Sequence, residues 1–442
     1  MEKSLFIEYV SRVWPKLNLY VKEKVNGQKK PLKYYHKEML TPVFSADQKW
    51  EGTSANTTYV AADMVAMDSP LPLKSRDSIA QAGGKLPKVG MKKQLKETQI
   101  NAINIMKAHL SMTSDEGAKK AQLRRILNKI TDDGYACAVG IDERNELNFL
   151  KGLSEGIILV PDEENTGTGM RVNYGYLPEN SFGVAVADNF TGDDMERVLT
   201  KADADGNTLS VIAIALSTYN KIRKSQWAKE LVANYKEQVV MDNSKLPVPT
   251  ASSFDEAFKS EYGLDFLKID RSVIIEKNGK KTSVKPFNPN KLIFLPQADN
   301  VGSLVWGTLA EDTNRVAGVE YSTVDDYKLI SRYSKTDPLQ EITNGQALCL
   351  PVIEDVDLIY SIDLSDAQVV DETKEGEDPT DEKITIWGKT YNKPEFVQAL
   401  NKIAGSKLSA KSADGKVIAK ANELSDADEE ALKTAVETHI AS

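Results

Sequence analysis

The stretch Gly152-Leu153-Ser154-Glu155-Gly156 is the pattern in this sequence that could carry covalent chemistry. In the G-x-S-x-G motif of hydrolases, the serine stands on a sharp turn between a strand and a following helix, which exposes its hydroxyl as a nucleophile. The sequence predicts the opposite order here, with a helix before the motif and a strand after it. A serine nucleophile also needs a histidine base, and the three histidines are scattered at His36, His109 and His439. We interpret the motif as a turn from helix to strand and keep a serine hydrolase using Ser154 as an alternative.

A short acidic turn resembles part of a calcium loop, but its spacing does not fit one. Residues 203–207 read Asp-Ala-Asp-Gly-Asn, and the twelfth position, where such a loop needs a bidentate glutamate, is Ile214. The two cysteines, Cys137 and Cys349, stand apart among apolar neighbours, so they form no ligand cluster with the histidines. The sequence contains neither a P-loop nor a dinucleotide-binding glycine motif. We therefore expect a protein that is not an enzyme and has no catalytic residue, cofactor or metal site.

The composition is that of a globular protein from a reducing compartment. The 442 residues are 41% hydrophobic and 27% charged, and this length allows about two to four domains. The longest apolar run is far shorter than the roughly 18 residues of a membrane span. The N-terminus lacks the pattern of a secretory signal. Two cysteines, both in apolar surroundings, fit buried free thiols.

The net charge of −9 is unevenly distributed. Residues 371–383 (DETKEGEDPTDEK) hold seven acids and two lysines, which gives −5 in thirteen positions. A protein that grips DNA through its phosphates normally has a basic face or domain, and none stands out in the sequence. We therefore expect no sequence-specific binding of nucleic acid. The acidic stretch is typical of a linker, and residues 384–442 after it predict a small module with a strand and two helices.

Residues 40–96 look extended yet have no apparent core of their own. They contain four prolines, the pair Gly83-Gly84 and several lysines. A loop of this length inside a compact domain is usually functional or disordered. This one is too apolar for a solvated linker, since it carries Tyr59, Val60, Met64, Val65, Met67, Leu71, Leu73, Ile79, Leu86 and Val89. We predict that it is buried against another copy of the chain or against a partner.

From Glu97 the pattern becomes helical. One apolar stripe consists of Ile100, Ile103, Met106 and Leu110. Residues 113–116 read as a capping box before a second stripe made of Leu123, Ile126, Leu127 and Ile130. The opposite face carries Lys119, Lys120, Arg124, Arg125 and Lys129. We interpret that face as solvated, with contact to an acidic neighbour or to packaged nucleic acid as the alternative. A further short helix is predicted from Asp142 to Lys151, ending at Gly152.

Strands and helices alternate in the middle of the chain. Strand patterns are predicted at 157–160, 170–174, 182–186, 209–216, 267–276, 281–287, 292–295, 304–306 and 348–362. Helices are predicted at 193–202, after Ser225, and from Ser253 to Gly263. The pair Asn278-Gly279 is a strong hairpin signal. This order indicates a mixed α/β arrangement rather than an all-α or all-β fold.

Six stretches, taken in order, carry a resemblance to a known family. They are residues 68–76 (DSPLPLKSR) with 84–88 (GKLPK), 148–153 (NFLKGL), 274–279 (IIEKNG) with 292–296 (LIFLP), and 302–311 (GSLVWGTLAE). In this order they resemble the tailed-bacteriophage major capsid proteins of the Hong Kong 97-type fold, in the branch that includes the lambda-like capsid proteins. None of the stretches is a catalytic fingerprint.

The resemblance implies an α+β phage capsid fold with a defined order of parts. These are an N-terminal arm (1–45), an extended loop (46–96), a peripheral domain with a long spine helix (97–187), an axial α/β domain (188–345), return strands of the peripheral domain (346–370), the acidic linker (371–383) and a small C-terminal α/β module (384–442). In this family the extended loop lies across a neighbouring subunit, which accounts for its apolar residues. The C-terminal module is not part of the common fold, and we interpret it as a surface decoration.

The function implied is that of a major capsid protein, which self-assembles through pentamers and hexamers into an icosahedral shell around double-stranded DNA. The implied partners are other copies of the chain, a scaffolding protein, a portal and packaged DNA held by non-specific contact, with no membrane. The protein would be part of the virion and assemble in the cytoplasm of a bacterial host. Candidate residues for salt bridges between subunits are Lys74, Arg76, Lys85, Lys88, Lys92, Lys93 and Lys96. A shell protein of an encapsulin-like nanocompartment, which shares the fold, stays an alternative.

Overall fold

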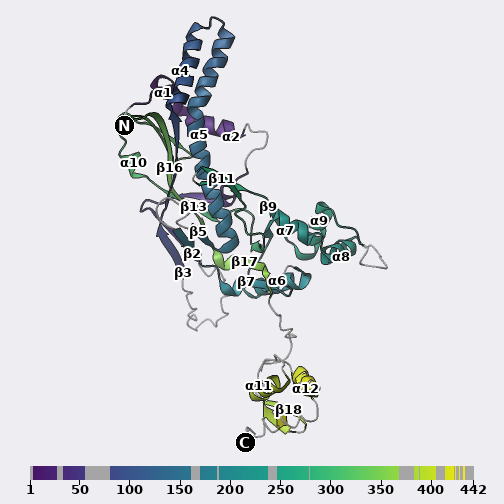
Figure 1. Cartoon of the computed structure of the whole chain (residues 1–442). Coiled ribbons are helices and arrows are strands. Elements are labelled where there is room, and N and C mark those ends of the chain that lie inside the picture. Colours follow the sequence, from purple (N-terminus) through teal and green to yellow (C-terminus); the bar gives the residue numbers. More distant parts are fainter. Residues whose placement is uncertain are drawn as a thin grey trace, which may run out of the picture. The chain divides into compact units, whose positions relative to one another are not determined.

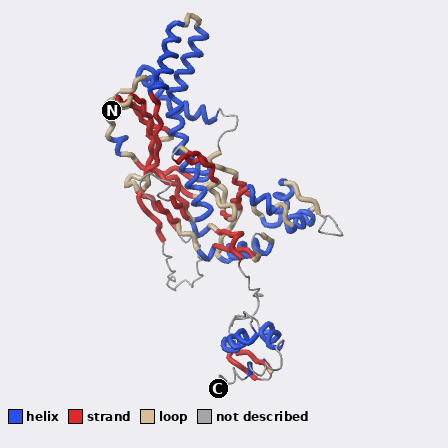
Figure 2. Tube along the Cα trace, in the orientation of Figure 1, coloured by secondary structure: helices blue, strands red, loops and turns tan. Residues whose placement is uncertain are grey.

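The computed structural model divides the chain into two units, Met1–Gln368 and Val369–Ser442. Figure 1 colours the chain along its sequence, and Figure 2 shows its helices and strands. The residues that the structure describes are 3–26, 33–54, 80–160, 170–186, 189–236, 246–277, 279–367, 383–387, 389–404, 414–422, 424, 428 and 432–433. None of the helices within these ranges is long and apolar enough to cross a bilayer.

A six-stranded sheet forms the centre of the larger unit. Its main path runs β1 (Leu40–Phe44), β13 (Gly302–Gly307), β16 (Leu339–Ile353), β15 (Lys328–Thr336) and β14 (Glu320–Val324). Strand β4 (Lys88–Lys96) joins this sheet by pairing with β16 in antiparallel register. Strand β1 is parallel to β13, whereas the other pairs are antiparallel. The sheet therefore gathers segments from three distant parts of the sequence.

A second sheet carries most of the shorter helices. Its order is β7 (Ser181–Val184), β17 (Tyr360–Ala367), β12 (Lys291–Leu295), β8 (Val211–Ala215) and β9 (Asp265–Ile269). Its apolar core is built with α6 (Gly192–Ala204), α7 (Leu216–Ile222), α8 (Gln226–Tyr235) and α9 (Ala251–Tyr262). All of β8 is buried, as expected for a strand with covered faces. Strands 302–336 belong to the first sheet, so the domain boundary expected at residue 345 does not coincide with the division between the two sheets.

Helix α5 (Glu116–Glu155) runs for 40 residues. The carboxylate of Asp115 accepts a hydrogen bond from the Ala118 amide at its start, and Gly156 ends it in the left-handed region with φ of 70°. The separate short helix expected at 142–151 is therefore wrong, because these residues are the last turns of α5. Helix α4 (Glu97–Met112) precedes α5 and packs beside its first turns (Figure 1).

The N-terminal residues form helices that pack on this same chain. They are α1 (Ile7–Val13), η1 (Trp14–Lys16), α2 (Leu17–Asn26) and α3 (Tyr35–Met39). One stripe at helical spacing is fully or almost fully buried: Phe6, Val10, Trp14, Leu17 and Val21. It forms a core with α4, α5 and the first sheet. The segment 3–26 is thus an amphipathic helical element. The resemblance in sequence implies only an N-terminal arm for residues 1–45.

The extended stretch 40–96 is partly built into its own subunit, which corrects the expectation that it lacks a core. Strands β2 (Lys49–Ser54) and β3 (Ala80–Lys85) form a two-stranded hairpin, and β4 follows. Trp50, Leu86 and Leu95 are buried in the cores of the larger unit. The sequence reasoning missed this because β16, the partner of β4, lies more than 240 positions later in the chain. The apolar residues from Tyr59 to Ile79 lie outside the described part of the chain.

The remaining elements are short. Two-stranded pairs are β5 (Ile157–Val160) with β6 (Met170–Asn173) and β10 (Val273–Lys277) with β11 (Lys280–Val284). The latter is the hairpin expected at Asn278-Gly279, and Gly279 has φ of 75°. Single turns are η3 (Pro178–Asn180), α10 (Ala310–Thr313) and η5 (Val356–Leu358). The α+β class expected from the sequence is confirmed.

The smaller unit has its own apolar core. It contains β18 (Lys383–Ile386), β19 (Lys389–Asn392), α11 (Lys393–Ala404) and α12 (Asp414–Asn422). Phe396 and Leu400 of α11 are fully buried, together with Val417 and Ala421 of α12. The acidic stretch 371–383 lies outside the described residues except for its last position.

A buried ion pair holds the N-terminal helices to the first sheet. Arg332 of β15 and Glu341 of β16 are fully buried, with Arg332 Nε 2.8 Å from Glu341 Oε1. Ser4 donates its hydroxyl to the same carboxylate, the Leu5 amide donates to the other oxygen at 3.1 Å, and Arg332 also donates to the Ile130 carbonyl of α5. The pair therefore connects the N-terminal helices, α5 and the sheet.

We predict that Glu341→Leu lowers the free energy of unfolding by about 3–5 kcal/mol, because it removes the carboxylate that is hydrogen-bonded to the buried Arg332 guanidinium. The double variant Arg332→Met/Glu341→Leu should recover part of this loss. Urea unfolding followed by circular dichroism measures both. The matched control is Asp265→Ala, which breaks the exposed Lys259–Asp265 pair at 2.7 Å and should cost about 0–1 kcal/mol. Equal losses for Glu341→Leu and Asp265→Ala would contradict the prediction.

Candidate assembly surface

Strand β4 has one paired edge and one edge without a strand partner among the described residues. Its pairing partner is β16 along residues 340–348. Side chains alternate along it, so that Lys88, Lys92 and Lys96 are exposed while Leu95 is buried. An edge strand presents unpaired N–H and C=O groups, which other chains can pair with, and lysines are a common way of limiting that pairing. The free edge of β4 can therefore pair with a strand of another chain, and its lysines limit non-specific pairing.

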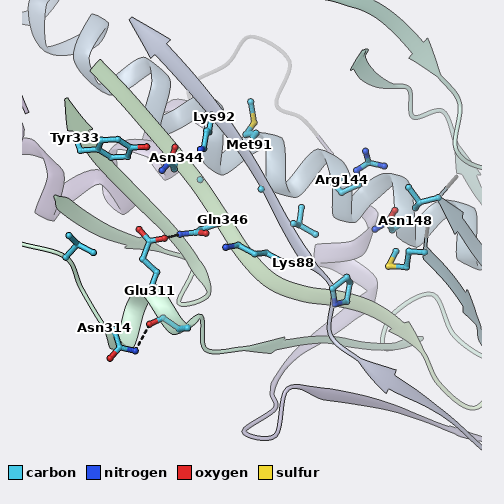
Figure 3. A pocket seen from close by; sticks show the side chains of 18 residues that line it. Lys88, Met91, Lys92, Arg144, Asn148, Glu311, Asn314, Tyr333, Asn344 and Gln346 are labelled. Carbon is cyan, nitrogen blue, oxygen red and sulfur yellow. Dashed lines mark hydrogen bonds between the residues drawn. The ribbon is translucent and has the colours of Figure 1, made fainter. Parts of the chain in front are cut away.

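A groove of about 1080 Å³ adjoins this strand. Figure 3 shows its lining from β4, β16, α5 and the α10 segment, including Lys88, Lys92, Arg144, Asn148, Glu311 and Gln346. Residues 87–92 contribute to the wall. A groove that follows a strand edge offers backbone hydrogen bonds as well as side-chain contacts to an incoming segment.

The groove contains both signs of charge, and within the described residues the amide oxygens of Asn148 and Asn344 in its lining have no hydrogen-bond partner. Glu311 accepts hydrogen bonds from Gln346 and from the Tyr321 hydroxyl, the latter at 3.3 Å. Asn148 is almost fully buried, and its Oδ1 has no hydrogen-bond partner within the described parts of the chain. A buried amide oxygen without a donor is costly. An incoming N–H or hydroxyl group would satisfy it.

The seven predicted interface residues do not form one cluster. Lys88, Lys92 and Lys96 share the exposed face of β4, and Lys85 is exposed at the end of β3. Lys93 points to the other side of β4, towards Asp133. Burial raises the pKa of the Asp133 carboxyl, and the positive charges of Arg332 and Lys93 reduce this rise without cancelling it. Within the part of the chain that is described, none of these five lysines forms an ion pair. Lys74 and Arg76 lie outside the described residues.

Ser154 is a structural residue in this fold. It is buried at the end of α5, where its hydroxyl donates to the Lys151 carbonyl at 3.2 Å and accepts from the Asn288 amide at 3.1 Å. The motif joins α5 to β5, so the order is helix then strand, as expected from the sequence. A nucleophile elbow needs the reverse order and an exposed hydroxyl. Ser154 therefore lacks the geometry of a hydrolase nucleophile.

The histidines serve other contacts. His36 is fully buried, with Nδ1 2.6 Å from Glu146 Oε2 and Nε2 3.9 Å from Asp142 Oδ1. The same Glu146 carboxylate accepts the backbone amides of Tyr35 and His36 at 3.0 and 3.1 Å. His109 is exposed on α4, and His439 lies outside the described residues. Glu146 thus fixes the start of α3 on α5.

The other suspected sites are also structural. Asp205, in the calcium-like turn, pairs with Lys201 and accepts from the Tyr360 hydroxyl at 2.7 Å, while Gly206 takes a left-handed turn after α6. Burial raises the pKa of the Cys137 and Cys349 thiols to about 12, so both stay protonated at neutral pH. Across the described ranges, no group of histidine, cysteine and acidic side chains is suited to bind a metal ion.

An ion network joins α3, α5 and the turn between β14 and β15. The buried ammonium of Lys328 lies 2.5 Å from Asp142 and 2.7 Å from Asp325. Lys37 lies 2.9 Å from Asp142 and 3.4 Å from Asp325. Burial opposes ionisation of Asp325, but Lys328 and Lys37 more than offset it and lower its pKa to about 2. The network holds the Asp325 turn of the sheet against α5.

Comparison with known proteins gives matches in structure but not in sequence. No family model and no curated protein matches the chain. A prophage protein of E. coli CFT073, described as a capsid protein, is 12% identical, with a TM-score of 0.45 over 78% of this chain and 98% of that chain. The capsid of cyanophage A-1(L) is 13% identical, with a TM-score of 0.40 over 77% and 95%. The SrpI encapsulin of Synechococcus elongatus PCC 7942 is 11% identical, with a TM-score of 0.32 over 81% and 98%.

These structures are phage capsid proteins and an encapsulin shell protein.

We predict that Asp325→Asn removes a pH-dependent part of the stability. Because the pKa of Asp325 is lowered in the folded protein, its carboxylate stabilises the fold above about pH 4, and this contribution is lost as pH falls through about 2. At neutral pH the variant should lose about 2 kcal/mol. Urea unfolding at a series of pH values measures this, with exposed Asp203→Asn as the control. Parallel pH profiles for wild type and Asp325→Asn would overturn the assignment.

Proposed function

We propose that this chain is a major capsid protein, which self-assembles into the icosahedral shell enclosing the double-stranded DNA of a tailed phage. The observation that carries the proposal is the edge of β4, which among the described residues has no strand partner, bears exposed lysines without ion pairs and borders a groove with unsatisfied amide oxygens. The rest of the larger unit is well packed, with charged groups buried in pairs. Such a body, with the β4 edge beside a groove, suits docking of a segment from another copy.

The mechanism is polymerisation rather than catalysis. A strand from a neighbouring copy would pair with β4 and place its side chains in the groove, which supplies affinity through backbone hydrogen bonds and specificity through pockets. Because β4 and the docking strand are different surfaces, the contact is heterologous, and it forms a ring when the rotation between successive copies closes. Rings of five and six are the capsomers that an icosahedral shell requires. Exposed lysine salt bridges would add about 0–1 kcal/mol each.

The order of parts supports the same assignment. Residues 46–96 would be the extended loop, and Tyr59 to Ile79 within it would lie on a neighbouring subunit. The spine helix would be α5, in a peripheral domain of 97–187 completed by 346–370, with 188–345 as the axial domain. The acidic stretch 371–383 would tether the module 384–442 as a surface decoration. The proposed contributors to subunit contacts are Lys74, Arg76, Lys85, Lys88, Lys92, Lys93 and Lys96.

The proposal includes partners and a location. A scaffolding protein and a portal would take part in assembly in the bacterial cytoplasm, and the product would be the virion. Packaged DNA would be held by non-specific contact, in keeping with the absence of a basic domain in the sequence.

Negative-stain electron microscopy of the expressed protein tests the proposal first. We expect shells or ring-shaped capsomers, formed either by the protein alone or when it is co-expressed with its neighbouring genes. A protein that stays monomeric under both conditions would contradict it. Nuclease-protected DNA inside purified particles would distinguish a phage capsid from an encapsulin-like nanocompartment, which would contain protein cargo.

We predict that the double charge reversal Lys88→Glu/Lys92→Glu reduces shell yield at least about tenfold, because it places negative charge beside Glu311 and along the docking edge. Sedimentation and electron microscopy measure the yield. The matched control is Lys281→Glu, an exposed strand lysine on β11, which should leave the yield unchanged. Normal shells from the double variant would remove β4 as the docking edge.

A further inference from the structure

Helix α4 has an outer face without charge. Of its sixteen residues only Glu97 and Lys107 are charged. Glu97 is the first residue of the helix. The ammonium of Lys107 lies 5.5 and 5.1 Å from the ring centroids of Phe6 and Tyr9, so this side chain is directed to the N-terminal helices. The protein as a whole is 27% charged, so an exposed helix face with no charge is unusual in it.

The helix carries an inner apolar stripe and, on the opposite side, an outer seam that is polar at Asn101 and continues with Ile105, Ala108 and Met112. The inner stripe, Ile100, Ile103, Met106 and Leu110, packs in the core shared with α5. The outer positions follow the alternating spacing of four and three residues that coiled-coil seams use, and they are Asn101, Ile105, Ala108 and Met112. Ile105 is 58% exposed and Met112 is 82% exposed. The positions that flank this outer seam are also uncharged: Ala102, Asn104, His109 and Ser111.

This pattern differs from an ordinary surface helix. A surface helix normally buries one apolar stripe and presents charged residues on the opposite side. A single exposed apolar residue needs no explanation. Here the exposed side carries apolar and small residues at Ile105, Ala108 and Met112, the spacing that interlocks with a second helix, over the second half of α4. The face therefore has the character of an interface that is open in the single chain.

We propose that the outer face of α4 packs against the same face of α4 in a second copy of this chain. The flanking positions of a helix pair select partners by charge, and those of α4 carry none. A neutral face does not repel its own copy, and it offers no charge that would select an acidic or basic partner. Ala108 at the centre allows two helices to approach closely. Such a contact is isologous, with the same residues on both sides of a two-fold axis.

This inference rests on the proposed function in one respect, because an assembled shell offers two-fold axes between capsomers. The outer face of α4 is a different surface from the β4 edge and its groove. The β4 contact would close rings, whereas the α4 contact would join two copies. Failure of either contact can therefore be detected without the other.

Single cysteines introduced on the outer face test the contact. Cys137 and Cys349 are buried, so an introduced cysteine is the accessible thiol among the described residues. Ile105→Cys, Ala108→Cys and Met112→Cys are made one at a time in the full chain and oxidised mildly. We expect a disulfide-linked dimer from at least one of the three on a non-reducing gel. The control is Ile274→Cys, at a 65% exposed position on β10, which should stay monomeric.

A second variant separates a specific contact from random collision. Adding Ile105→Glu to the cysteine variant that crosslinks best, at Ala108 or Met112, puts a charge into the seam and should reduce dimer yield at least about tenfold. Ile105→Leu in the same background should leave it unchanged. Absence of dimer from all three cysteines, or equal yields with Glu and Leu, would overturn the inference. Shells that form without α4 crosslinks would support the proposed function and contradict the α4 contact. Crosslinks that form without shells or capsomers would support the α4 contact and contradict the proposed function.

Discussion

The close approach of α5 to the first sheet is the constraint on which the rest of the larger unit depends. At Gly140 a side chain would overlap the sulfur of Met91 on β4. At Gly345 on β16 an added Cβ would lie 2.6 Å from Cys137 Cβ on α5. Glycine on both the helix and the sheet allows this spacing, and interiors packed this tightly transmit displacements rather than absorb them. The 40-residue helix and the sheet therefore behave as one support for the N-terminal helices and the β4 edge.

Buried ion pairs then fix which segments meet on that support. Arg332–Glu341 ties the N-terminal helices to one part of α5, and the Asp142–Lys328–Asp325–Lys37 network ties α3 and a sheet turn to another. Such pairs are poor sources of net stability, because desolvation offsets much of their attraction. Their effect is on specificity: an alternative packing would leave a charge buried without a partner. We infer that these pairs set the position of β4 relative to α5, and so the shape of the groove.

Local patterns in the sequence predicted local structure well and distant pairing poorly. The helix at 251–262, the strand β8 and the hairpin at Gly279 each follow from residues within a few positions, such as the glycine at 263 in the left-handed region. Strand β4 could not be assigned in this way, because its partner β16 is contributed from the far end of the unit. The sequence predicts the lysines as a set of candidates for salt bridges between subunits, but only the strand alternation separates the exposed Lys92 from the half-buried Lys93. The His36–Glu146 contact had no local signal at all.

The β4 edge and the outer face of α4 differ in the interactions that they can form, and this difference would suit the proposed closed shell. An open strand edge forms directional hydrogen bonds, so it fixes the register and angle of a neighbour and suits a contact repeated around a ring. A neutral helix face depends on packing and permits small changes of crossing angle. Rings of five and of six meet at different angles in an icosahedral shell. A directional contact within rings combined with an adjustable one between them would let a single sequence occupy both environments.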